Sequence, residues 1–279
     1  MEALDTPQPA SVRASVLRIR GGALAPASDY DVLAEETPIA LEYNGISHAT
    51  MLATPTDLED FAIGFSLTEG IVDSAHDVRD IELRADSDGV VVAVTISSAC
   101  GARLKQRRRA LSGRTGCGLC GVETLPEVLR DIPAVPPGPR MTVGAVLAAM
   151  RAMRGRQALH GLTGATHAAG WADAHGAVGL VREDVGRHNA LDKLVGALAR
   201  HAPGAAPHAA AGAGMIVVSS RASFEMVQKT AAARVGILAA VSAPTALAQR
   251  LADRLGIALL GFMRDDNATL YAHAERIAP

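Results

Sequence analysis

The stretch GMIVVSSRASFEMVQKTAAARVGILAAVSA, residues 214–243, decides the class of fold. It opens with a short apolar run bounded by glycine, which is typical of a buried strand, and it closes with a second such run. Between the two runs lies a segment with the residue types and apolar spacing of a helix. A strand, a helix and a strand in this order predict an α/β fold, in which helices cover a sheet.

The same alternation extends to both sides of this unit. Two further strands and two further helices are predicted, at 177–184, 258–264, 186–200 and 244–255. Residues 201–214, HAPGAAPHAAAGAG, interrupt the rhythm as a low-complexity surface loop. We therefore expect residues 141–279 to form a layered α/β region with a largely parallel sheet.

The first half of the chain shows mixed signals. Residues 1–30 are rich in Ala, Pro and Ser, and we expect them to be a mobile leader. A smaller mixed region follows over 31–140, with strands at 36–45 and 89–97, a helix at 54–70, a basic run at 103–109 and a double-cysteine loop. Thr56 and Glu59 are expected to form a capping box at the start of that helix.

Composition and charge exclude several classes of protein. Of the 279 residues, 49% are hydrophobic and 20% are charged, which is typical of a soluble globular chain. The net charge of -2 gives no basic field for nucleic acid, and no apolar run is long enough for a membrane span. The N-terminus lacks the apolar core of a secretory signal, so we expect a cytoplasmic protein without structural disulfides.

Polar residues follow each apolar strand of the second half. These clusters are EDVGRHN at 183–189, SSRAS at 219–223, SAPT at 242–245 and RDDN at 264–267. Because carboxyl ends of parallel strands meet at one edge of the sheet, together with helix N-termini, this edge is the expected ligand crevice. Arg187, His188 and Asn189, directly before a helix, are the strongest candidates for binding an anion there.

Two of the three cysteines, Cys117 and Cys120, lie in the glycine-rich stretch TGCGLCG. A structural zinc site would need four ligands at recognisable spacing, and a zinc deaminase would need an HxE motif upstream of the pair, so neither class fits. Glycines on both sides do not favour the helix that follows the cysteines of a thioredoxin-type site. The remaining interpretation is a thiol carrier whose thiolate is stabilised by the preceding basic run. Cys100 follows an apolar strand and is expected to be buried and inert.

The motifs GRTGCGLCG, EDVGRHNALDK, SSRASFEMVQK, ILAAVSAP and GFMRDDN, in this order, resemble the formate dehydrogenase accessory sulfur-carrier family, FdhD. The resemblance runs from about residue 35 to residue 275. It implies a cytoplasmic homodimer with a fold like that of cytidine deaminases. It further implies that the protein takes sulfur from a cysteine desulfurase as a persulfide and passes it to the molybdenum bis(guanine dinucleotide) cofactor of formate dehydrogenase.

The resemblance also implies which residues carry these roles. Cys117 resembles the persulfide-bearing residue, and Cys120 would assist relay or resolve the persulfide. No resident metal is expected, and GDP is the expected surrogate for half of the cofactor. The residues expected to bind the cofactor are Phe262, Met263, Arg264, Asp265, Asp266, Asn267, Arg187, His188, Asn189 and Arg221.

Two other functions remain open from the residues alone. A dithiol redox enzyme would cycle Cys117 and Cys120 between dithiol and disulfide. A non-catalytic chaperone would bind the cofactor and the dehydrogenase without chemistry on sulfur.

The acidic pair in RDDN is not what we would expect at a site for a polyanionic cofactor. It suits a guanine edge better than a phosphate, because a carboxylate accepts the hydrogen bonds of guanine N1 and N2.

Overall fold

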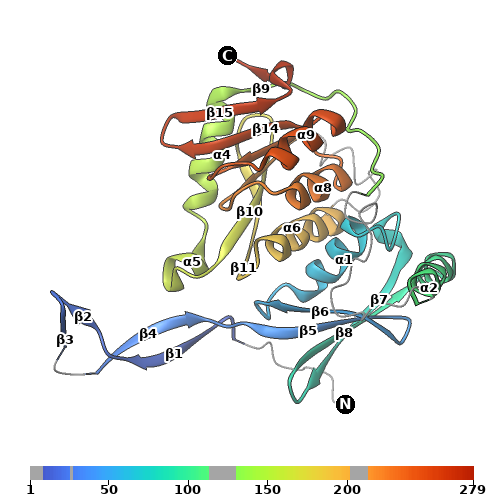
Figure 1. Ribbon diagram of the computed structural model, residues 1–279, viewed down its shortest axis with the longest axis horizontal. Helices are drawn as coiled ribbons and strands as arrows, with labels where there is room; N and C mark the ends of the chain where they lie inside the picture. The colour runs from blue at the N-terminus through green and yellow to red at the C-terminus, as the bar shows by residue number, and fades with distance from the viewer. Residues whose placement is uncertain (1–8, 26–27, 113–129, 202–212) are drawn as a thin grey trace.

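The computed structural model describes residues 9–25, 28–112, 130–201 and 213–279, with side chains omitted for 108–112. The two largest sheets are a six-stranded sheet from the C-terminal half and a four-stranded sheet from the N-terminal half. They lie in the upper and lower parts of the view, with helices between them (Figure 1). Within the described residues, no helix has both the length and the apolar character needed to cross a membrane.

The C-terminal sheet has six strands in the order β11-β10-β12-β13-β14-β15. They are β10 (His167–Ala172), β11 (Val178–Asp184), β12 (Met215–Val218), β13 (Ile237–Ala240), β14 (Ala258–Arg264) and β15 (Asn267–Ala272). The βαβ unit predicted at 214–243 is confirmed, since β12 and β13 are parallel and β13 and β14 continue the parallel block.

The expectation of a largely parallel sheet is wrong. β10 is antiparallel to both β11 and β12, and β15 returns antiparallel to β14, so the sheet is mixed. β10 has no strong signal in the sequence, because HAAGWA, with small residues and a glycine, lacks the β-branched residues typical of strands. Because β10 is antiparallel to both neighbours, β11 and β12 run in the same direction. Their carboxyl ends therefore lie at the same edge of the sheet, as predicted.

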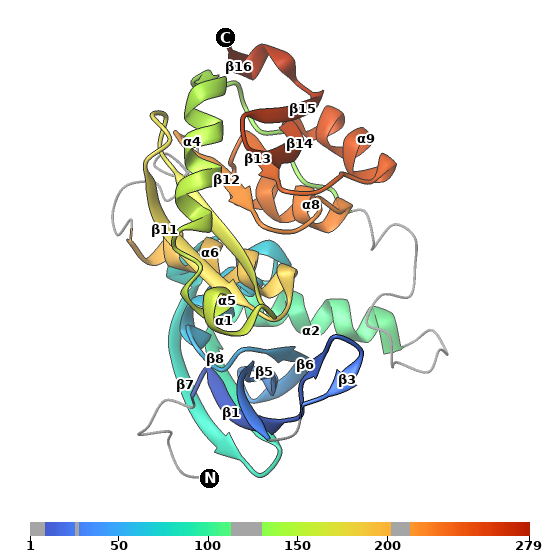
Figure 2. The same cartoon turned by 90° about the vertical axis from the view of Figure 1, so that its left-hand side faces the viewer.

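Helices cover both faces of this sheet. The elements are α4 (Val143–Arg154) on one face, and α6 (Arg187–His201), α8 (Phe224–Ala232) and α9 (Ala246–Leu255) on the other (Figure 2). Thr142 caps α4 by accepting a hydrogen bond from the Ala145 amide. The cytidine-deaminase-like layering stays a prediction, whereas the mixed α/β class is observed.

The N-terminal sheet has four strands in the order β6-β5-β8-β7. They are β5 (Thr37–Tyr43), β6 (Ile46–Ala53), β7 (Val78–Asp86) and β8 (Gly89–Ile96). Phe61 and Phe65 of α1 (Leu58–Thr68) pack against this sheet and form with it a hydrophobic core that is separate from those of the C-terminal sheet. The capping box expected at Thr56 and Glu59 is wrong: the N-cap is Asp57, with a positive φ of 52° and no side-chain cap bond.

The other face of α1 packs on α6, which joins the two halves of the molecule. Gly64 and Gly196 lie at the crossing, where a Cβ atom on Gly64 would stand 1.7 Å from the carbonyl oxygen of Asp192. Only glycine allows backbones to approach this closely. The crossing therefore fixes the position of α1 beside α6 and α8.

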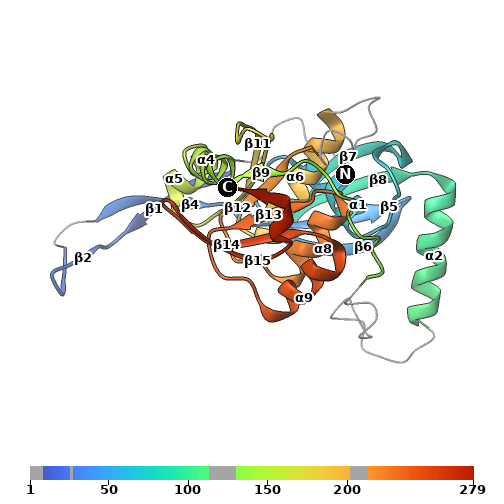
Figure 3. The ribbon, with the colours of Figure 1, turned by 90° about the horizontal axis from the view of Figure 1, so that it is seen from above.

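The expected mobile leader, residues 1–30, contains strands. Its described part forms an arm, β1 (Ser11–Val16), β2 (Ile19–Arg20), β3 (Ala23–Leu24) and β4 (Asp29–Ala34), which extends away from the body (Figure 3). β1 pairs with β4 antiparallel, since Val12 and Leu33 and their neighbours supply cross-strand contacts. The remaining small elements are α2 (Ser98–Ser112), α5 (Ala158–Thr163), and the paired β9 (Met141–Thr142) and β16 (Ile277–Ala278).

Candidate functional site

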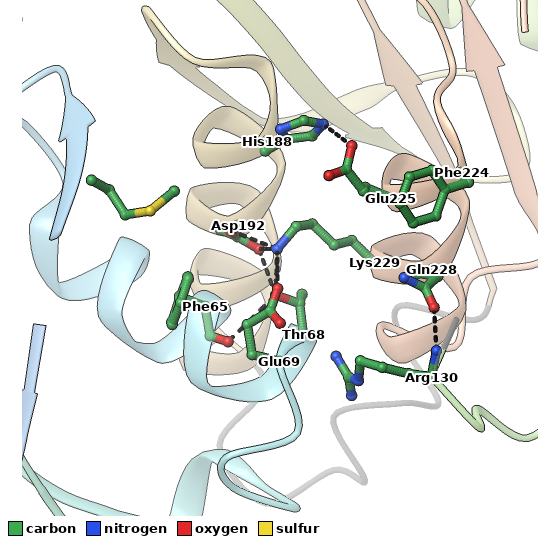
Figure 4. A pocket seen from close by; sticks show the side chains of 11 residues that line it. Phe65, Thr68, Glu69, Arg130, His188, Asp192, Phe224, Glu225, Gln228 and Lys229 are labelled. Atoms are coloured by element: carbon green, nitrogen blue, oxygen red, sulfur yellow. Dashed lines mark hydrogen bonds and ion pairs between the residues drawn. The ribbon is translucent and has the colours of Figure 1, made fainter. Parts of the chain in front are cut away.

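A pocket of about 380 Å³ lies where α1, α6 and α8 meet (Figure 4). Its walls combine apolar and charged side chains: Met51, Phe65, Thr68, Glu69, Arg130, His188, Asp192, Phe224, Glu225, Gln228 and Lys229. A volume of this size suits a small molecule or a few side chains of another segment.

Lys229 is the central charge of the pocket. Its Nζ donates to Asp192 Oδ1 at 2.9 Å, to Glu69 Oε1 at 2.9 Å and to Thr68 Oγ1 at 3.1 Å. Burial alone would lower the pKa of Lys229, but the charges of Asp192 and Glu69 outweigh it and raise the pKa above its ordinary value. The ammonium group therefore stays charged although the side chain is buried, and α1, α6 and α8 are tied together through it.

A second charged pair lies at the other end of the pocket. His188 Nε2 lies 2.9 Å from Glu225 Oε2, and the hydrogen bond from His188 holds the pKa of Glu225 below its ordinary value. Ser223 lies 3.4 Å from the same imidazole nitrogen. The start of α6 is thereby joined to the start of α8 at the rim.

Residues on both flanks of the cysteine-bearing segment contact elements that form this pocket. Arg107 of α2 donates to the carbonyl oxygen of Glu69 at 3.5 Å, and the Arg130 amide donates to Gln228 Oε1 at 2.8 Å. Arg130 itself lines the pocket, and its guanidinium lies where a Cβ on Gly70 would be only 2.6 Å away. Arg107 and Arg130, on the two flanks of that segment, therefore both lie near the C-terminal end of α1, where Glu69 is located.

Cys117 and Cys120 lie outside the described residues. Cys100 is buried at 1% exposure, as expected, and its Sγ accepts a hydrogen bond from Arg103 at 3.3 Å. Arg103 also pairs with Asp73 at 2.7 Å. The described part of the basic run is thus divided, with Arg103 turned to Cys100 and Arg107 turned to Glu69.

The residues predicted at the start of α6 differ in accessibility. His188 lines the pocket, whereas Asn189 is buried and its side-chain amide donates to the Leu52 carbonyl oxygen and to Asp184. Arg187 is only partly buried, yet within the described chain its Nε is a buried atom with no hydrogen-bond partner. Arg221 is exposed on the same edge.

The predicted cofactor segment at 262–267 forms the hairpin between β14 and β15. The hairpin contacts α4 in two places. Asp266 forms an ion pair with Arg151 at 2.8 Å, and the Met263 carbonyl oxygen accepts a hydrogen bond from Arg154 at 2.7 Å. None of its residues is among those that line the pocket in the described structure. Phe262, Arg264, Asp265 and Asn267 are exposed, whereas the Met263 side chain is buried and cannot reach a ligand without rearrangement.

The comparisons with known proteins identify the family. Residues 34–278 match the FdhD/NarQ family model. A protein of Bordetella petrii named sulfur carrier protein FdhD is 64% identical over 264 residues, covering 95% of this chain and 93% of the relative. This chain belongs to the FdhD/NarQ family. A protein of the same name from Variovorax paradoxus is 51% identical over 265 residues, covering 95% of this chain and 93% of that relative.

A solved structure agrees with FdhD/NarQ membership at the level of fold. The crystal structure of a candidate formate dehydrogenase accessory protein from Desulfotalea psychrophila superimposes with a TM-score of 0.72. The match covers 97% of this chain and 100% of that chain, at 22% identity. At this identity the likeness shows a common fold and nothing finer.

Sequence reasoning missed most of the residues that line the pocket of this FdhD/NarQ protein. Glu69, Asp192 and Lys229 had not been singled out, although Asp192 and Lys229 stand inside two of the quoted motifs. A signal was available for Asp192 and Lys229, because each lies within its helix beside apolar residues, where an unpaired charge would be costly. The partners on other helices could not be read from spacing within one helix.

Proposed function

We propose that this chain is a cytoplasmic sulfur carrier that takes sulfur from a cysteine desulfurase and passes it to the molybdenum bis(guanine dinucleotide) cofactor for formate dehydrogenase. The observation that carries the proposal is the 64% identity, over nearly the whole of both chains, to the Bordetella petrii protein named sulfur carrier. Cys117 is the proposed carrier residue, and Cys120 assists relay or resolves the persulfide.

The loading step follows from ordinary thiol chemistry. The Cys117 thiolate attacks the terminal sulfur of a persulfide on the desulfurase, forming a new S–S bond. The S–S bond to the desulfurase cysteine breaks, and that cysteine leaves as a thiolate, so electrons balance without any further oxidant or reductant. Cys117 then carries the sulfur as its own persulfide.

The pocket supports this proposal through its chemistry and its place along the chain. A persulfide anion is soft and charged, and it would be sheltered by the aromatic rings of Phe65 and Phe224 and by the charge of Lys229. On the two flanks of the segment that bears Cys117, Arg130 lines this pocket and Arg107 donates to the carbonyl oxygen of Glu69, whose residue also lines it. A partly enclosed site between these flanks, with a buried cation, suits a reactive sulfur.

The cofactor enters as a substrate, and two places suit its nucleotide groups. The Nε of Arg187, buried without a partner in the described chain, stands at the start of the fifteen-residue helix α6, where an oxyanion is favoured. The exposed hairpin residues Arg264 and Asp265 offer a cation and a carboxylate for phosphate and guanine respectively. The homodimer implied by the resemblance stays a prediction.

Complementation tests the proposed function. In a cell that lacks its own copy, this chain should restore formate dehydrogenase activity, and Cys117→Ala should abolish the restored activity. Cys100→Ala is the matched control, because Cys100 is buried in the core away from the pocket lining, and it should retain activity. Normal activity of the Cys117 variant would show that sulfur does not travel on that residue.

A further inference from the structure

Arg130 brings a positive charge without a counter-ion to the pocket between α1, α6 and α8. Its backbone amide donates to Gln228 Oε1 at 2.8 Å, and its guanidinium lies over the end of α1, where a Cβ atom on Gly70 would stand 2.6 Å from Nη2. Among the described residues, no carboxylate forms an ion pair with this guanidinium, and Glu69 pairs with Lys229 instead. Burial lowers the pKa of Arg130, and the charge of Glu69 offsets this only in part. An arginine in a protein keeps its proton, so this charge is available to a ligand.

Glu69 brings a carboxylate oxygen that its ion pair does not use. Its Oε1 accepts from Lys229 at 2.9 Å, whereas Oε2 has no hydrogen-bond partner in the part of the chain that the structure describes, and 34% of the side chain is exposed. Burial would raise the pKa of Glu69, but the charges of Lys229, Arg130 and Arg107 outweigh it and keep the carboxylate ionised. Arg130 and Glu69 thus present opposite charges at the same end of the pocket without forming an ion pair with each other (Figure 4).

The wall beside these charges is apolar. Met51, Phe65 and Phe224 line the pocket, and the centre of the Phe65 ring lies 5.7 Å from Lys229 Nζ. The Phe65 ring therefore stands next to the charged end of the pocket. Aromatic rings make favourable contacts with aliphatic carbon and with divalent sulfur, which is soft and polarisable. The pocket thus combines an unpaired cation, a free carboxylate oxygen and an apolar wall in one small space.

The balance of charge decides which class of ligand fits. Apart from His188, the charged side chains that line the pocket in the described chain are three carboxylates and two cations: Glu69, Asp192, Glu225, Arg130 and Lys229. A simple anion at Arg130 would be repelled by the carboxylates, and a simple cation at Glu69 would be repelled by Arg130 and Lys229. A ligand that carries both charges on neighbouring atoms avoids both penalties. The volume of about 380 Å³ lies near the lower end of the range for ligand pockets, roughly 300–1,000 Å³, which favours a small ligand.

We propose that this pocket binds a free α-amino acid whose side chain is small and apolar or carries sulfur. The α-carboxylate of the ligand pairs with the Arg130 guanidinium, whose planar fork matches a carboxylate, and the α-ammonium group donates to Glu69. The side chain of the ligand then lies against Phe65. Because these three contacts radiate from one carbon atom, the pocket distinguishes the L-enantiomer from the D-enantiomer. This binding site is additional to the proposed sulfur carriage and requires no chemistry on Cys117.

Calorimetry on the full chain with S-methyl-L-cysteine tests this assignment, because the methylated sulfur can form neither a persulfide nor a disulfide. The native protein should bind this ligand at least tenfold more tightly than methylthiopropionate, which lacks the ammonium group, or methylthioethylamine, which lacks the carboxylate. The D-enantiomer should also bind more weakly. These comparisons use only the native protein, so they do not depend on how a substitution affects the fold.

Two variants locate the site. Arg130→Gln should weaken S-methyl-L-cysteine at least tenfold and leave methylthioethylamine unchanged, whereas Glu69→Gln should weaken it similarly and leave methylthiopropionate unchanged. The controls Arg250→Gln and Glu82→Gln remove exposed charges outside the pocket lining and should keep the native affinity, with the fold checked by circular dichroism. No binding at millimolar ligand, equal affinity for the amino acid and both analogues, or native affinity in Arg130→Gln would each overturn the proposal. None of these results bears on sulfur carriage, which complementation measures separately.

Discussion

The backbones of α1 and α6 touch at Gly64 and Gly196. A Cβ atom on Gly64 would lie 2.8 Å from the Gly196 nitrogen, and a Cβ on Gly196 would lie 2.9 Å from the Gly64 nitrogen. Because the neighbouring atoms belong to backbones, neither side can yield by turning a side chain. The crossing holds Phe65, Thr68 and Glu69 of α1 opposite α6 and α8, and so it sets the shape of the pocket.

Replacing Gly64 by alanine should therefore destabilise the protein. Overpacking of this kind costs about 1–3 kcal/mol or more, and we expect Gly64→Ala to lower the Tm by roughly 5–10 °C. Gly161→Ala is the control, since a Cβ on Gly161 in α5 would meet nothing within 4 Å, and its Tm should be equal or slightly higher. Thermal unfolding followed by circular dichroism measures both, and an unchanged Tm for Gly64→Ala would show that the helices separate at no cost.

Two matched ion pairs allow the effect of the pocket's charges on sulfur transfer to be separated from their effect on stability. Lys229 with Asp192 lines the pocket, whereas Lys193 with Asp184, 2.7 Å apart and also buried, does not. Removing one partner of a buried pair costs about 3–5 kcal/mol, so both charges are removed together in Lys229→Met, Asp192→Asn and in Lys193→Met, Asp184→Asn.

The first double variant should lose at least tenfold in persulfide transfer per folded molecule, because the charge that shelters the sulfur is gone. The second should keep transfer near the native rate, after correction for the folded fraction by circular dichroism. Equal losses in the two variants would mean that these pairs act only through the fold.

Acid should destabilise the protein partly through His167. Burial, together with the charges of Arg187 and His160, lowers the pKa of His167 below its ordinary value of 6.5. Its contribution to stability is therefore complete above pH 6.5 and is lost as the pH falls toward the lowered folded pKa, because the unfolded chain binds the proton first. Urea midpoints at pH 7.5 and pH 5.5 should differ less in His167→Asn than in the native protein, and an equal difference would contradict this assignment.

Much of the C-terminal half could be predicted from sequence, since its elements are local. The strands and helices between residues 177 and 264 were recognised because each is a short apolar run or a helical pattern bounded by glycine or proline. The relative directions of the strands could not be predicted, because HAAGWA carries no strong strand signal and β10 pairs antiparallel with both of its neighbours. The arm was missed because its Ala, Pro and Ser content resembles that of an unstructured leader.

The site was predicted only in part for a related reason. His188 was found because it follows a strand end, where ligands usually gather. Lys229 and Glu69 meet only through the packing of α8 on α1, which lie 160 positions apart at this contact, and no local pattern encodes such a meeting. The role predicted for Asn189 in binding stays a prediction, although its amide donates to the Leu52 carbonyl oxygen, a contact that the sequence does not reveal.

The hairpin at 262–267 makes a specific prediction about guanine. We expect the native protein to bind GDP more tightly than ADP in calorimetry, and Asp265→Asn to lose that preference, because a carboxylate accepts from guanine N1 and N2. Asparagine is chosen since Asp265 has a φ of 52°, which asparagine tolerates. Arg264→Ala should weaken both nucleotides alike, and equal native affinity for GDP and ADP would rule out guanine recognition at this hairpin.

Intact mass spectrometry after incubation with cysteine and a cysteine desulfurase tests the central claim most directly. The account predicts a gain of one sulfur, about 32 Da, which is located on Cys117, removed by a thiol reductant and absent from Cys117→Ala but present in Cys100→Ala. A loss of two hydrogens instead, joining Cys117 to Cys120, would identify a redox dithiol. An unchanged mass under conditions in which the desulfurase is active would contradict the sulfur carrier account.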